Sequence, residues 1–173
     1  FGNNNFKIIN EYLISIHKEP ILILSGDKDF VQLHRYNSAV SVKQYDPINK
    51  KYVVSEDPVQ FMKEHIIKGD AGDGIPNFLS PDNSLVDNIR QKPISKKNLS
   101  EWVRSAPSEF CDEERFRNYK RNEVLIDLSN TPSQLRQKIM EEYEAQGGKN
   151  RSHIMNYMIK NRLKVLMESI GDF

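Results

Sequence analysis

Hydrophobic positions in the first part of the chain alternate between helical spacing and short apolar runs. Residues 6–17 place Phe6, Ile9, Leu13 and Ile16 at helical intervals. Residues 21–24 then form an apolar run bounded by turn residues, the pattern of a strand buried on both faces. A helix that leads into such a strand is half of a βαβ unit, so the pattern predicts the α/β fold class.

Two further elements follow with local signals at their ends. The alternating residues 39–54 predict two strands joined by a turn at residues 46–49, which is a hairpin. The segment after it predicts a helix with Asp57 as its N-cap, Pro58 at its first position and Gly69 at its C-terminal cap. Residues 29–36 predict another short helix, which Asp27 or Asp29 could cap.

Beyond residue 69 the pattern weakens and then becomes wholly helical. Residues 70–94 show no regular spacing, whereas residues 95–105 predict a helix with an apolar stripe that includes Trp102, which we expect in the core. After Pro107 the pattern is helical only, closing with a helix over residues 151–170. We therefore expect the remnant of a parallel-sheet core with a hairpin, followed by a mostly helical C-terminal extension. The expected divisions are residues 1–69, 70–105 and 106–173.

Composition narrows the possible chemistry. The net charge of the 173 residues is only +1, so any binding to nucleic acid must use local patches. The single cysteine, Cys111, excludes an intrachain disulfide and a cysteine-based zinc site. The four histidines, at positions 17, 34, 65 and 153, lack ligand spacing, and the sequence assigns none to a metal. No apolar run is long enough to span a bilayer.

Two pairs of aspartates carry the candidate chemistry. Asp27 and Asp29 follow the apolar strand, and Asp70 and Asp73 lie in the glycine-rich segment GDAGDGIP. Two carboxylates about 4 Å apart repel by roughly 4 kcal/mol at an effective dielectric near 20. A divalent cation such as Mg²⁺ would offset that repulsion. Helix capping by the first pair and local turns in the second pair are the alternative interpretation.

The two segments, SGDKDFVQL and then GDAGDGIPN, together resemble the structure-specific 5′ nuclease (flap endonuclease) superfamily. Within it, VKQYDPINKKYV, IIKGD, RFRNYKRNEVLIDL and SIGDF are similar to the RNase H type 5′-to-3′ exonucleases of T-even-like bacteriophages. The resemblance covers the chain from about residue 6 onward. It implies a PIN-like core and a metal-dependent phosphodiesterase that removes RNA primers and 5′ flaps from duplex DNA during phage replication.

The resemblance also implies roles for the four aspartates. Asp27 matches a ligand of a first Mg²⁺ ion, with Mn²⁺ as a possible replacement. Asp29 and Asp73 match carboxylates of a second ion, and Asp70 matches an acidic neighbour. Asp27, Asp29 and Asp73 would be catalytic through a metal-activated water, without a covalent nucleophile.

Two departures from the family qualify this expectation. The family also uses upstream acidic residues, and this chain starts at Phe1 without a methionine. We therefore expect a piece of a longer protein, with an incomplete metal site and weak or no activity alone. Many relatives also continue the second motif into a helix-hairpin-helix that holds a monovalent ion, but residues 77–97 read differently here.

Backbone contacts to duplex DNA would be sequence-independent and salt-sensitive. The expected nucleic-acid-binding residues are Gly69, Gly72, Gly74, Lys92, Lys96 and Lys97, with Lys50 and Lys51 as weaker candidates. The basic residues between 115 and 121 are interleaved with glutamates, which favours a solvated helix face.

The sequence also fits other functions. The chain could bind duplex DNA as a scaffold without cleaving it, or it could be an unrelated Mg²⁺-dependent phosphohydrolase. Family analogy alone suggests a single-stranded DNA-binding protein as a partner of the terminal helices, and the cytoplasm of an infected bacterium as the location. No membrane partner is expected.

Overall fold

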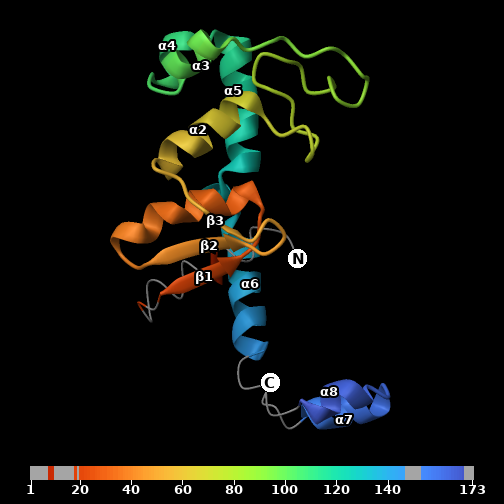
Figure 1. Cartoon of the computed structure of the whole chain (residues 1–173). Coiled ribbons are helices and arrows are strands. Elements are labelled where there is room, and N and C mark those ends of the chain that lie inside the picture. The colour runs from red at the N-terminus through yellow and green to blue at the C-terminus, as the bar shows by residue number, and fades with distance from the viewer. Residues whose placement is uncertain (1–7, 10–17, 19, 147–152, 170–173) are drawn as a thin grey trace. The chain divides into compact units, whose positions relative to one another are not determined.

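The computed structural model of the protein describes residues 8–9, 18, 20–146 and 153–169. The helix expected over residues 6–17 lies outside this part, except that residues 8 and 9 are helical. The chain forms two compact units, residues 1–139 and residues 140–173. Figure 1 shows the order of the elements along the chain. The three-part division expected from the sequence stays a prediction.

The first unit contains a small mixed sheet of three strands, β1 (Ile21–Leu24), β2 (Val42–Asp46) and β3 (Lys51–Val53), in the order β1-β2-β3. β1 pairs with β2 in parallel, with Ile21 opposite Val42, whereas β2 and β3 are antiparallel. A parallel pair requires a crossover connection, which the 3₁₀ helix η1 (Lys28–Ser38) supplies. The structure thus confirms the α/β class, the parallel strands and the hairpin.

η1 covers one face of this sheet. Phe30 and Leu33 of η1 form a buried cluster with Ile23 of β1 and Val42 of β2. The alternate residues of β1, Leu22 and Leu24, are 56% and 66% exposed. The prediction that β1 is buried on both faces was therefore wrong for the described structure, because an apolar run does not reveal whether a second layer covers the sheet.

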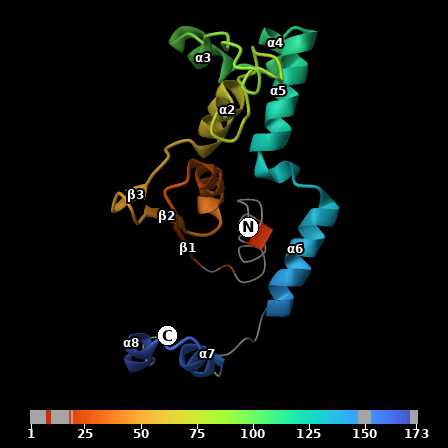
Figure 2. The same ribbon diagram turned by 90° about the vertical axis from the view of Figure 1, so that its right-hand side faces the viewer.

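Helix α2 (Pro58–Lys68) begins and ends where the sequence predicts. The Asp57 carboxylate caps it by accepting the N–H of Gln60 at 2.8 Å, and Gly69 ends it with φ of 68°. α2 packs against both η1 and α5 (Glu113–Ile126), and Figure 2 shows α5 running alongside it. α2 therefore connects the sheet layer to the helices that follow.

A second core forms between α2 and the helices α3 (Lys96–Trp102), α4 (Pro107–Phe110) and α5. Phe78, which is fully buried, lies at its centre. Its ring centroid is 5.2 Å from that of Trp102 and 5.8 Å from that of Phe110, both in edge-to-face geometry. Trp102 is partly buried and packs against this core, in agreement with the prediction.

Residues 70–94, which lack a hydrophobic pattern, are held by buried polar groups. Asn77 donates to the carbonyl of Lys92 at 2.9 Å and accepts from the Ser80 hydroxyl at 2.9 Å. Asn122 of α5, which is fully buried, donates to the carbonyls of Ile66 and Pro76, both at 2.9 Å. The segment is thus anchored by amide side chains, which hydrophobic spacing cannot detect.

The chain continues through η2 (Leu128–Asn130) and α6 (Ser133–Gln146) to α7 (Ile154–Lys160) and α8 (Lys164–Glu168). The single helix expected over residues 151–170 was wrong, because the described part is interrupted between α7 and α8. Arg162 there has φ of 55°, and the Asn161 side chain donates to the carbonyl of Tyr157. Among the described residues, no helix is both long and apolar enough to cross a membrane.

Candidate functional site

The loop after β1 places the first aspartate pair at the carboxyl end of the strand. The Asp27 carboxylate accepts the N–H of Asp29 at 3.0 Å and so caps η1. The side chain of Gln44 on β2 donates to the carbonyls of Ser25 and Asp27, at 2.8 and 2.7 Å. The strands β1 and β2 and the N-terminus of η1 therefore hold the backbone of this loop in place.

The turn after α2 places the second pair. The N–H of Ile75 donates to the carbonyl of Asp70 at 2.7 Å and closes the turn. Gly69 opens it, and a Cβ at this position would lie 2.6 Å from the carbonyl oxygen of Pro76. With its positive φ, Gly69 is a position that only glycine fills without strain. The Asp70 carboxylate accepts the N–H groups of Gly72 and Asp73, at 2.9 and 3.3 Å.

His65, in the last turn of α2, joins the two loops. Its Nε2 lies 3.0 Å from Asp70 Oδ2, and its Nδ1 lies 3.9 Å from Asp29 Oδ1. One potential ligand atom from each of Asp29, His65 and Asp70 lies within 4.8 Å of the others. The side chains are partly buried, with 19%, 16% and 34% exposure respectively. We refer to these three residues as the Asp29–His65–Asp70 cluster.

The environment of Asp70 favours its ionised form. Burial raises the pKa of Asp70, but the hydrogen bond from His65, those from the N–H groups of Asp73 and Gly72, and the charge of His65 lower it. The net effect is a pKa below the ordinary value for an aspartate. A carboxylate that stays ionised is suited to binding a cation.

The structure brings together only part of the set of aspartates named from the sequence. Asp29 and Asp70 meet across His65, whereas Asp27 and Asp73 are exposed and are not members of the cluster. His65 was not assigned to a metal from the sequence. The only signal for such a role is its position one helical turn before Gly69 and Asp70, in the last turn of the predicted helix. The metal and catalytic roles of Asp27 and Asp73 stay predictions.

A cavity of about 340 Å³ opens beside the cluster. His65 and Asp70 line it together with Lys28 and Lys68. Lys68 also pairs with Glu64 one turn earlier on α2. Two ammonium groups next to carboxylates and an imidazole create a site where both a cation and a phosphate could be held.

The remaining candidate residues lie on exposed surface. Lys92, Lys96 and Lys97 are exposed, as are Gly72 and Gly74. Ser95 caps the helix that Lys96 and Lys97 begin, by accepting the N–H of Asn98 at 3.1 Å. These positions are open to a ligand, and their role in DNA binding stays a prediction.

Comparison with known proteins gives two findings. A family model described as "T4 RNase H, C terminal" matches residues 57–173. The chain is also 29% identical, over 174 aligned residues, to a curated protein named Ribonuclease H from Enterobacteria phage T4. That alignment covers 96% of this chain and 55% of the phage T4 protein, so the chain spans about half the length of this relative.

Proposed function

The chain belongs to the T4 RNase H family, matching its C-terminal model, and from this premise we propose that it forms part of a divalent-metal-dependent 5′ nuclease. The observation that carries the proposal is the convergence of Asp29 and Asp70 on His65. These carboxylates come from two loops far apart in the sequence, as expected for a shared cation. Family membership argues against an unrelated phosphohydrolase.

The proposed reaction is hydrolysis of phosphodiester bonds at 5′ ends of duplex DNA, as a 5′-to-3′ exonuclease and flap endonuclease. Its proposed substrates are RNA primers and 5′ flaps formed during phage replication in the host cytoplasm. The strands β1 and β2 are parallel neighbours, and η1 connects them along the chain. This arrangement is consistent with a PIN-like core. The carboxyl end of β1, where Asp27 and Asp29 lie, is the edge at which open α/β sheets bind ligands.

The donor set of the cluster fits a divalent cation. Two carboxylates suit Mg²⁺ or Mn²⁺, and an imidazole adds a nitrogen ligand that Mn²⁺ accepts more readily than Mg²⁺. Asp29, His65 and Asp70 would hold the ion. When bound, such a cation would act as a Lewis acid that stabilises negative charge at the attacked phosphate.

Other residues of the chain would orient the substrate. Lys28 and Lys68 line the cavity beside the cluster and would hold a phosphate of the strand to be cleaved. Gln44 keeps the Asp27–Asp29 loop in place through its two backbone hydrogen bonds. As the family resemblance implies, Asp27 would hold a first ion, and Asp73 would serve, with Asp29, the ion of the cluster; both Asp27 and Asp73 are exposed.

A second candidate function is duplex binding without cleavage by this chain. Asp27 and Asp73 do not join the cluster, so the described residues offer three ligands for one ion instead of a complete two-metal site. We therefore expect the chain alone to cleave slowly or not at all. Rapid cleavage of a 5′-flap duplex by the 173-residue chain would contradict this expectation.

A titration with Mn²⁺ tests the proposed metal site directly. Electron paramagnetic resonance measures the concentration of free Mn²⁺ and so gives the amount bound. Asp29→Asn and Asp70→Asn should each weaken Mn²⁺ binding by at least about tenfold, because each removes a charged ligand. Asp87→Asn, in an exposed loop, is the matched control and should bind as the wild type does. Equal binding by all four proteins would overturn the assignment.

A further inference from the structure

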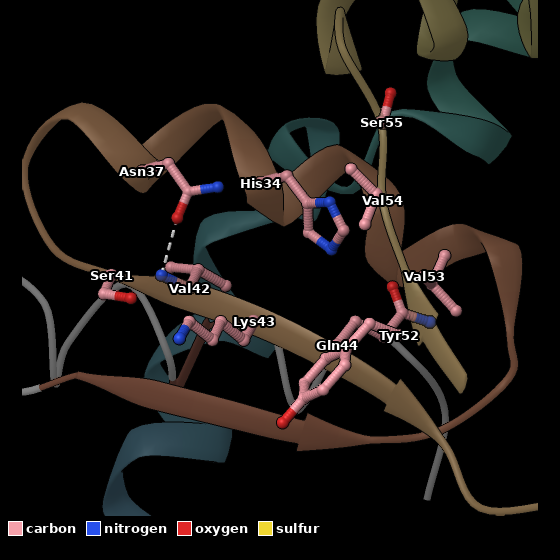
Figure 3. A pocket seen from close by; sticks show the side chains of 10 residues that line it. All are labelled: His34, Asn37, Ser41, Val42, Lys43, Gln44, Tyr52, Val53, Val54 and Ser55. Carbon is pink, nitrogen blue, oxygen red and sulfur yellow. Dashed lines mark hydrogen bonds between the residues drawn. The ribbon is translucent and has the colours of Figure 1, made fainter. Parts of the chain in front are cut away.

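A second cavity, of about 490 Å³, lies between η1 and the β2–β3 hairpin (Figure 3). It shares no residue with the Asp29–His65–Asp70 cluster. Two of its lining residues, His34 and Gln44, have polar atoms that face each other and are inaccessible to solvent, so they offer nothing to a ligand. Residues 52–55, in and just past β3, form another side of the cavity. The same residues lie at an edge of the described sheet.

The hydrogen bonds of β2 show which backbone groups of β3 are already used. The N–H of Ser25 donates to the carbonyl of Tyr45 at 2.9 Å, so the backbone groups of Tyr45 face β1. Backbone groups alternate in direction along a strand, so those of Gln44 face β3, where Gln44 pairs with Val53. The backbone groups of Val53 therefore face β2.

The residues on either side of Val53 face the free edge. By the same alternation, the N–H and C=O groups of Tyr52 and Val54 point away from β2. Within the described part of the chain, no group hydrogen-bonds to them. The residues Tyr52 and Val54 are also 59% and 80% exposed. Unpaired backbone donors and acceptors beside exposed apolar side chains form an edge that another extended chain can pair with.

The surface around this edge is basic. Lys43, Lys50 and Lys51 are exposed, and none of them forms an ion pair with another described residue. The acid of the hairpin, Asp46, is buried and accepts the side-chain amide of Asn49 at 2.6 Å. No acidic side chain is among the described residues that line the cavity. The local charge therefore favours a ligand that carries carboxylates.

We propose that the free edge of β3 binds an extended acidic segment of a partner protein as an added strand. The backbone of that segment would bond to Tyr52 and Val54, and its carboxylates would contact the lysines of the hairpin. One of its apolar side chains would enter the cavity, where Val42, Val53 and Val54 supply apolar wall.

Two other occupants fit the edge less well. Pairing with the same edge of a second copy would bring the lysines of both copies together, which is unfavourable. A sugar–phosphate backbone offers acceptors to the N–H groups of Tyr52 and Val54, but phosphate oxygens cannot donate to their carbonyls. Only another peptide backbone supplies donors and acceptors in the same alternation.

The test is a titration of the ¹⁵N-labelled chain with the acetylated and amidated peptide Asp-Glu-Val-Thr-Val-Asp-Glu. EDTA is present, since the proposal requires no metal at the Asp29–His65–Asp70 cluster. We expect saturable shifts of the Tyr52 and Val54 amides, at a Kd below about 1 mM. Both amides should also exchange more slowly with water, whereas the Val53 amide, already bonded within the sheet, should change little.

Two control peptides separate backbone pairing from attraction between charges. Replacing the central threonine with proline removes a backbone donor and should weaken binding at least about tenfold. Replacing all four acids with lysine should abolish binding, because the hairpin is basic.

Variants of the chain check the same two contributions. Val54→Pro removes an N–H that is free in the sheet edge, where proline is tolerated, and should weaken binding at least about tenfold. Val54→Thr keeps the N–H and should bind as the wild type does. Lys43→Glu should weaken binding several-fold, whereas Lys138→Glu, the same charge change at an exposed position of α6, should not.

Four results would overturn the proposal. No shift of Tyr52 or Val54 at about 10 mM peptide would mean that the edge does not pair. Equal binding of the threonine and proline peptides would mean that charge alone attracts them. Equal slowing of exchange by a DNA duplex would assign the edge to nucleic acid, and slowing with protein concentration alone would assign it to a second copy. The peptide comparison uses the wild-type chain, so it decides the matter even if Val54→Pro does not fold.

Discussion

At the scale of single residues, Asp46 ends β2 at the same edge of the sheet as the candidate aspartates, but its carboxylate serves the hairpin. It accepts the N–H groups of Ile48 and Asn49, both at 2.9 Å, and the side-chain amide of Asn49 at 2.6 Å. A Cβ at Gly26 would lie 2.6 Å from Asp46 Oδ2, so glycine is needed where the chain leaves β1. Asp46 is thus a structural acid beside a candidate functional loop.

Asp46 should make stability depend on acid pH. The hydrogen bond from the Asn49 side chain, followed by that from its N–H, lowers the pKa of Asp46 against the opposing effect of burial. Its contribution to stability is therefore present above the pKa of the unfolded chain, about 3.9, and is lost as pH falls through the lower folded value. Urea unfolding of the wild type and Asp46→Asn, from about pH 6 to about pH 2.5, measures this contribution.

The variant should be less stable than the wild type at pH 6, and the difference should shrink as the pH falls below about 4. Two curves that stay parallel down to the lowest pH would show that Asp46 is not the group responsible.

At the scale of elements, α5 positions the loop that carries Asp70. Its fully buried Asn122 donates to the carbonyls of Ile66, near the end of α2, and Pro76, just past the Asp70 turn. Arg121 donates to the same Pro76 carbonyl at 3.0 Å and pairs with Asp82. Its side chain is only 18% exposed, so the prediction of a solvated face was wrong for Arg121. One face of α5 therefore acts as the anchor of residues 70–82.

Replacing Asn122 with leucine should test this anchor. Leucine has a similar size but no donor, so the carbonyls of Ile66 and Pro76 would each lose the hydrogen bond from Asn122. The Pro76 carbonyl would keep the one from Arg121. We expect a cost of about 1–3 kcal/mol in the free energy of unfolding. Mn²⁺ binding should also weaken, because the turn that holds Asp70 would be less constrained. Chemical denaturation and the paramagnetic titration measure the two effects.

Asn98→Leu, at an exposed position of α3, is the control and should change stability by less than about 0.5 kcal/mol. If Asn122→Leu were as stable as this control, the buried amide could not be what anchors the loop.

At the scale of the whole molecule, the near-zero net charge means that DNA binding depends on where the lysines lie. Lys96 and Lys97 are exposed at the start of α3. Each phosphate contact contributes about 0.9 to the slope of log affinity against log salt concentration. The double variant Lys96→Ala/Lys97→Ala should therefore bind a DNA duplex with a slope smaller by about 1–2.

The control Lys160→Ala/Lys164→Ala removes the same charge from the second unit and should keep the wild-type slope. Fluorescence anisotropy with a labelled duplex at several salt concentrations gives both slopes. An unchanged slope for the first pair would remove these lysines from the proposed DNA contact.

Local signals in the sequence predicted most helices and strands, but they did not predict how these elements pack against one another. The hairpin, the capped helix after Asp57 and the core position of Trp102 follow from turn residues, capping residues and spacing, which act between near neighbours. The exposed face of β1 and the break between α7 and α8 were missed. The first depends on which layer covers the sheet, and the second on a single residue with positive φ, Arg162.

The sequence by itself determined the family, through two aspartate motifs in a fixed order, and it determined the α/β class through local pattern. Only the tertiary structure decided that Asp29 and Asp70 meet at His65, and that His34 and Gln44 line one cavity. The reason is physical. Spacing and capping are interactions over a few residues, whereas a site depends on packing between β1, η1, α2 and α5, which no local pattern specifies.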